Sequence, residues 1–134
     1  MLVIKKEQIE KFIAEDDTQL IRVITEIVRE AFYDGVKDHS DKTLESMAKI
    51  GIERAKSRKF ERAEDIAAFV AIMFEISPGF DSVEQIDALL NDEAVPVDMR
   101  LEQMAGRIPD DVWAEAEMTY DSKTWFPDAP AAKE

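Results

Sequence analysis

The sequence contains no cysteine, only one histidine and only four glycines among its 134 residues. Without cysteine the chain has no disulfide framework, no thiol nucleophile and no sulfur ligand for a metal. Zinc and non-haem iron sites usually recruit several His or Cys ligands, so His39 alone predicts no metal site, and we expect no cofactor. The scattered glycines form no phosphate-binding loop. The lack of cysteine is typical of a reducing compartment, which predicts a cytoplasmic protein.

Long hydrophobic runs are also missing. The longest, Ile66–Phe74, has nine residues, whereas a helix needs roughly 20 to span a bilayer. Charged residues begin at Lys5, which is not typical of a signal peptide. We therefore expect no membrane partner and assign Ile66–Phe74 to a buried helix.

Basic residues are scarce in the second half of the chain. The net charge is −13, and residues 68–134 hold 15 acidic but only four basic residues. A field of this sign repels phosphate backbones, which argues against nucleic acid as a partner. In the first half, six basic residues crowd the stretch Lys49–Arg62. They could pair with the acidic half of the same molecule or form a binding patch, and the sequence leaves both alternatives open.

Helical periodicity runs along most of the chain. Apolar residues recur at three- and four-residue steps, while no stretch alternates long enough to predict a strand. The pattern predicts an all-α fold, with one compact domain of six or seven helices over residues 1–120. Residues 121–134 contain two prolines and are expected to form an extended, partly disordered tail. The expected helices cover about residues 5–14, 18–35, 41–59, 62–76, 83–90, 99–105 and 110–120.

Three details of the pattern make structural predictions. The 62–76 helix is apolar around most of its circumference, so we expect it at the centre of the fold. Gly51, with alanines one turn to either side, would let another helix approach closely. Asp81 or Ser82 is expected to cap the 83–90 helix.

His39 is the only histidine that could act as a general base, and it lies in a turn with Ser40 and two aspartates. No nucleophile-elbow sequence accompanies it, and the members of a catalytic triad meet in space and not at consecutive positions. We therefore expect the protein not to be an enzyme. A carboxylate-based enzyme that uses His39 is a competing class.

The segment from Asp110 to Phe126 combines aromatic and acidic side chains. Aromatic side chains ringed by charge are typical of a protein-binding hot spot and its polar rim. The expected partner is a protein with a basic surface, because acidic charge steers such a surface toward the site. The alternative is that these aromatic side chains pack the last helix and fix the tail to the body. The candidate partner-binding residues are Asp110, Asp111, Glu115, Glu117, Met118, Asp121, Trp125 and Phe126.

Three short stretches, Gly51–Ala55, Phe69–Phe74 and Pro78–Asp81, carry a resemblance to a known group of proteins. Over about residues 1–105 the chain resembles small all-helical bacterial proteins whose genes lie beside type VI secretion effector genes. The resemblance implies an accessory role, either as an adaptor or chaperone that holds an effector for loading or as an immunity protein that neutralises it. It implies no catalytic residue. A further class, an acidic mimic of nucleic acid, would require acidic groups spaced regularly over one face.

Overall fold

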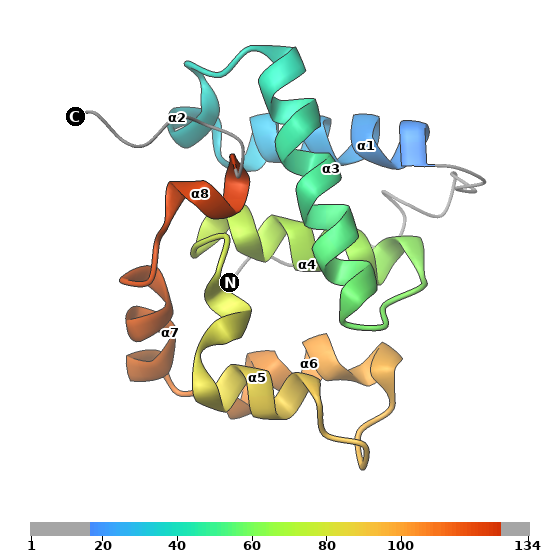
Figure 1. Cartoon of the computed structure of the whole chain (residues 1–134), viewed down its shortest axis with the longest axis vertical. Coiled ribbons are helices and arrows are strands. Elements are labelled where there is room, and N and C mark those ends of the chain that lie inside the picture. The colour runs from blue at the N-terminus through green and yellow to red at the C-terminus, as the bar shows by residue number, and fades with distance from the viewer. Residues whose placement is uncertain (1–16, 127–134) are drawn as a thin grey trace.

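The computed structural model describes residues 17–126, which form one all-α domain, as the periodicity predicts (Figure 1). This part of the chain contains eight α-helices, one 3-10 helix and no strand. Two of the α-helices, α2 (Tyr33–Val36) and α8 (Ser122–Trp125), are short and were not expected as separate elements. The helix predicted at 5–14 lies outside the described residues. The elements are α1 (Asp17–Ala31), α2 (Tyr33–Val36), α3 (Asp41–Ser57), α4 (Ala63–Glu75), the 3-10 helix η2 (Phe80–Ser82), α5 (Glu84–Leu90), α6 (Val97–Arg107), α7 (Asp110–Glu117) and α8 (Ser122–Trp125).

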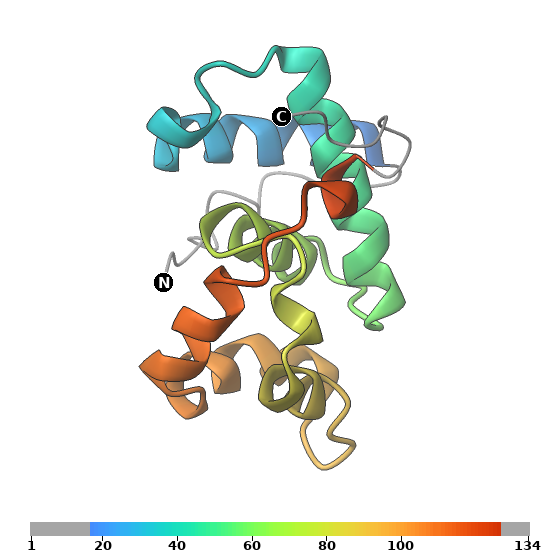
Figure 2. The same ribbon diagram turned by 60° about the vertical axis from the view of Figure 1, so that its left-hand side comes forward.

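Helix α4 lies at the centre of the fold, as predicted. It packs against α1 and α3 on one side and against α6 on the other, and Figure 2 shows the same arrangement from a second direction. Eight of its 13 residues are buried. The Phe69 ring contacts those of Phe60 and Phe80, at centroid distances of 5.7 and 5.1 Å. These three rings join the turn after α3 to η2, and so connect the two sides of the molecule.

Gly51 allows α3 and α4 to approach closely. A Cβ atom at this position would lie 2.8 Å from Val70 Cγ1 and 2.9 Å from Val70 Cγ2, well inside the normal separation of carbon atoms. Val70 is β-branched and fully buried, so it has little freedom to rotate away. The close approach predicted from the small residues of this helix is therefore confirmed.

We expect Gly51→Leu to lower the free energy of unfolding by about 1–3 kcal/mol, because the added side chain overpacks the contact between α3 and α4. Gly106→Leu is the matched control, since a Cβ atom at Gly106 in α6 meets nothing within 4 Å. There the higher helix propensity of leucine should raise stability by about 0.5–1 kcal/mol. Urea unfolding measures both changes. Equal effects at the two positions would contradict the close packing of α3 on α4.

The helix predicted at 18–35 is divided into α1 and α2. Phe32 lies between them with a non-helical backbone, at φ −128° and ψ 40°. The Arg29 guanidinium donates a hydrogen bond of 2.7 Å to the backbone carbonyl oxygen of His39 and pairs with Asp41 at 2.8 Å. These contacts stabilise the reversal of the chain between α1 and α3. They involve His39 and Asp41, which lie outside 18–35, so the apolar pattern of 18–35 does not predict them.

Helical structure also continues past the boundary predicted at residue 120. Residues 122–125 form α8, which lies against α3. The Trp125 side chain is only 3% exposed, and its ring lies 4.6 Å from that of Phe74 in α4. The first part of the predicted tail is therefore folded onto the domain, while residues 127–134 lie outside the described part of the chain.

Candidate protein-interaction surface

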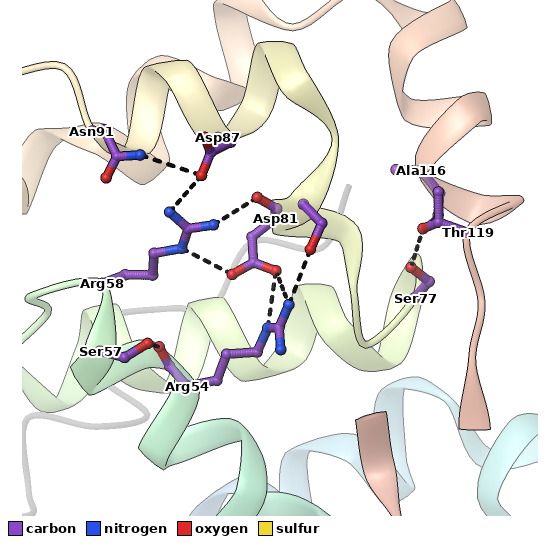
Figure 3. Close-up of polar contacts among 10 residues, drawn as sticks. Arg54, Ser57, Arg58, Ser77, Asp81, Asp87, Asn91, Ala116 and Thr119 are labelled. Atoms are coloured by element: carbon purple, nitrogen blue, oxygen red, sulfur yellow. Dashed lines mark hydrogen bonds and ion pairs between the residues drawn. The ribbon is translucent and has the colours of Figure 1, made fainter. Parts of the chain in front are cut away.

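Two arginines of the basic stretch, Arg54 and Arg58 at the end of α3, turn inward (Figure 3). Arg54 Nη2 lies 2.6 Å from Asp81 Oδ1, and Arg58 Nε lies 2.9 Å from Asp81 Oδ2. Arg58 also pairs with Asp87 of α5 at 2.8 Å and donates a hydrogen bond of 2.7 Å to the backbone carbonyl oxygen of Asp81. Only 2% of the Asp81 side chain is exposed. These four side chains, the arginine–aspartate cluster, join α3 to η2 and α5.

The prediction that Asp81 or Ser82 caps the 83–90 helix is wrong. Val83 occupies the N-cap position of α5, and its side chain forms no capping hydrogen bond with the residues that the structure describes. A buried carboxylate is stabilised more strongly by charge-assisted bonds from two guanidinium groups than by a single backbone amide, so Asp81 faces the arginines. Burial by itself lowers the pKa of Arg58, but the hydrogen bonds to Asp87 and Asp81 and the charges of both carboxylates outweigh it and raise the pKa.

Arg62 at the start of α4 is paired as well. It lies 3.1 Å from Asp65 and 3.5 Å from Asp98 of α6. Burial raises the pKa of Asp65, and the Arg62 charge only partly offsets this effect. Of the two alternatives for the basic stretch, pairing with acidic residues of the second half is therefore confirmed for Arg54, Arg58 and Arg62.

The acidic side chains of α7 are arranged differently from those of the cluster. All four are exposed, and none takes part in a salt bridge with another residue between 17 and 126. The segment 110–121 includes five acidic residues and no basic residue. Asp110 and Asp111 lie in the first turn, where negative charge interacts favourably with the helix dipole. Four of the 15 acidic residues of the second half are thus displayed together on α7.

Exposed apolar groups lie beside this charge. Met118 follows Asp111 and Glu115 at helical spacing, so the three share one face of α7. Met118 is 87% exposed, and Tyr120 in the following turn is 57% exposed. The α7 surface, as we define it, consists of Asp110, Asp111, Glu115, Glu117, Met118, Tyr120 and Asp121.

Two of the predicted partner-binding residues do not belong to this surface. Trp125 is buried against Phe74, and Phe126 is half-buried against the core. Trp113 also packs inward, with its ring stacked on Phe80 at 6.4 Å. The alternative interpretation, in which the aromatic side chains pack the last helix and the start of the tail, therefore holds for these three residues, whereas Tyr120 remains 57% exposed.

His39 lies beside a cavity of about 120 Å³ that Ser77 and Tyr120 also line. Among residues 17–126, its imidazole forms no hydrogen bond to a serine, threonine or tyrosine hydroxyl.

The part of the chain between residues 17 and 126 holds no group of three His, Asp or Glu side chains placed to bind one metal ion. None of the helices between 17 and 126 has the length and apolar character needed to cross a membrane.

The geometry thus presents an acidic, partly apolar surface on α7 and three arginines of the basic stretch that are paired internally. Comparison of the chain with protein-family models, with curated proteins and with solved structures gives no match in any of the three.

Proposed function

We propose that the chain is a non-enzymatic protein-binding protein whose α7 surface binds a basic surface of its partner. The observation that carries the proposal is the exposed face of Asp111, Glu115 and Met118, where two carboxylates that form no ion pair with another residue between 17 and 126 adjoin an apolar side chain. Exposed charge of one sign steers a partner of the opposite sign. An apolar group within the charged rim stabilises the complex, because binding removes its contact with water.

The internal pairing of the basic stretch supports the same proposal. Because Arg54, Arg58 and Arg62 are held by Asp81, Asp87 and Asp98, these arginines do not offset the charge of α7. A protein partner with a cluster of Lys or Arg side chains therefore meets an uncompensated acidic field.

The wider role that we propose is that of an accessory protein of a bacterial secreted effector, as an adaptor or chaperone or as an immunity protein. Its support is the resemblance of three stretches to proteins encoded beside type VI secretion effectors. Gly51, Phe69 and Phe80 from these stretches are buried, so the resemblance concerns residues that form the fold. Inhibition of the effector without the secretion machinery would favour immunity, whereas loss of effector loading without loss of self-protection would favour an adaptor.

Binding kinetics with the effector encoded by a neighbouring gene test the proposal. We expect the association rate to fall steeply between about 50 and 500 mM salt, while the dissociation rate changes less. Replacing Glu115, Glu117 and Asp121 with their amides should slow association about threefold or more, because steering charge is lost. Met118→Ala should speed dissociation by up to about tenfold, because an apolar contact is lost.

The matched control for the charge variants is Glu45→Gln with Glu53→Gln on α3, which removes exposed carboxylates far from α7 along the chain. It should leave both rates nearly unchanged. If the α7 variants bind at wild-type rates, or if the α3 control slows association equally, the partner does not use the α7 surface.

A further inference from the structure

The segment that follows α7 reaches across to the other side of the molecule. Figures 1 and 2 show it leaving α7 and ending in α8 beside α3. Two contacts along this path hold it to α4 and the turn after it. The Ser77 and Thr119 hydroxyl oxygens lie 3.2 Å apart, within hydrogen-bonding distance (Figure 3), and the ring of Trp125 contacts Phe74.

The packing beneath this segment is incomplete. The cavity of about 120 Å³ lies between the segment and the body of the domain. Tyr120 and Trp125 form its wall on the side of the segment, and Met47 of α3 and Met73 and Phe74 of α4 contribute to the opposite wall. Side chains that border a cavity lack contacts on one side, which weakens the attachment of the segment.

Within the described part of the chain, few other contacts hold the segment in place. Helix α8 has four residues, and an isolated helix of this length is not stable in water. Lys123 takes part in no salt bridge with another residue between 17 and 126. The hydrogen bonds to Asp121 from the amides of Lys123 and Thr124 are local and do not connect α8 to the body. The attachment thus depends mainly on two apolar side chains, the buried indole of Trp125 and the half-buried ring of Phe126.

We propose that α8 is a reversible latch: residues 119–126 undock together and withdraw Trp125 from α3 and α4, while α1 to α7 stay folded. Elements with few buried contacts open locally at a lower free energy than the whole domain. In the undocked state Trp125 is exposed a few residues from Met118 and Tyr120. If the proposed function of the α7 surface is correct, undocking adds an aromatic anchor to that surface, but the latch itself does not rest on that function.

The first experiment separates opening of the latch from unfolding of the domain. In Trp113→Phe, Trp125 is the only tryptophan, so its fluorescence reports on the latch. We expect this fluorescence to change at a lower urea concentration than the helical circular dichroism signal. In the matched variant Trp125→Phe, Trp113 reports on the body and should follow the dichroism. Superimposed curves in Trp113→Phe would overturn the proposal.

The second experiment measures how far the latch supports the rest of the fold. If the body stays folded without the latch, Trp125→Ala can remove only the stability that docking supplies. We expect it to lower the melting temperature by less than about 5 °C. Phe80→Ala, which truncates an equally buried aromatic residue of the body, should lower it by about 10 °C or more. Equal shifts in the two variants would overturn the proposal, and because no partner is present, this result is independent of the function of α7.

Discussion

Phe69→Asp is expected to leave the chain unfolded or aggregated at neutral pH. Phe69 has no exposed surface and contacts Phe60 and Phe80 in the centre of the core. A carboxylate at this position would lose its hydration among aromatic rings, at a cost of several kcal/mol. This cost is a large fraction of the roughly 5–15 kcal/mol that stabilises a typical domain. Circular dichroism and size-exclusion chromatography measure the loss of structure.

Two controls separate the effect of buried charge from that of any substitution. Ala105→Asp introduces the same carboxylate at an exposed position of α6, where it remains hydrated and should change stability by less than about 1 kcal/mol. Phe69→Leu keeps an apolar side chain in the core and should leave a folded, less stable protein. A soluble Phe69→Asp variant with an unchanged melting temperature would show that α4 is not the centre of the fold.

The second large effect is expected at Asp81. Asp81→Ala should lower the free energy of unfolding by about 3–5 kcal/mol, because it leaves the guanidinium groups of Arg54 and Arg58 partly buried without their shared carboxylate. Asp87→Asn is the matched control within the same cluster, since the Asp87 side chain is 46% exposed. Water can replace part of the interaction between Asp87 and Arg58, so we expect the free energy of unfolding to fall by about 1 kcal/mol or less. Urea unfolding measures both.

A double substitution tests the physical reason for this loss. If the cost arises from buried charge that has lost its partner, Arg58→Met in the Asp81→Ala background should recover part of the stability, since it removes one of the two partly buried guanidinium groups that no longer contact Asp81. Arg58→Met alone should destabilise, because Asp81 and Asp87 each lose a partner. Strictly additive losses in the double variant would show that the cluster is not energetically coupled.

The helices with a clear apolar face could be predicted closely from the sequence. Helix α3 was expected at 41–59 and extends over Asp41–Ser57, and α4 was expected at 62–76 and extends over Ala63–Glu75. Helical periodicity reports which face of a segment is buried, and this information is local. The close approach at Gly51 was predictable for the same reason, because the absence of a side chain is visible in the sequence itself.

The assignments that failed concern residues whose roles depend on distant partners. An aspartate before a helix is typical of an N-cap, but Asp81 lies 27 and 23 residues from the two arginines that bind it. Trp125 follows a stretch with no periodicity. Its ring is buried because it packs against Phe74 in α4, a contact that the sequence around Trp125 does not indicate. The basic stretch near Arg54 offered one signal, since its charge is opposite in sign to that of the second half, but the sequence could not say which carboxylates it meets.

The sequence by itself determined the all-α class, the central place of α4 and the excess of acidic charge in the second half. Composition and apolar spacing carry these properties, because each helix must bury its own apolar face. Only the tertiary structure decided which charges are paired internally and which aromatic side chains remain exposed. Both depend on contacts between residues far apart in the chain, such as Arg54 with Asp81 and Phe74 with Trp125. Folding thereby buries Trp125 and leaves the carboxylates of α7 together with Met118 at the surface.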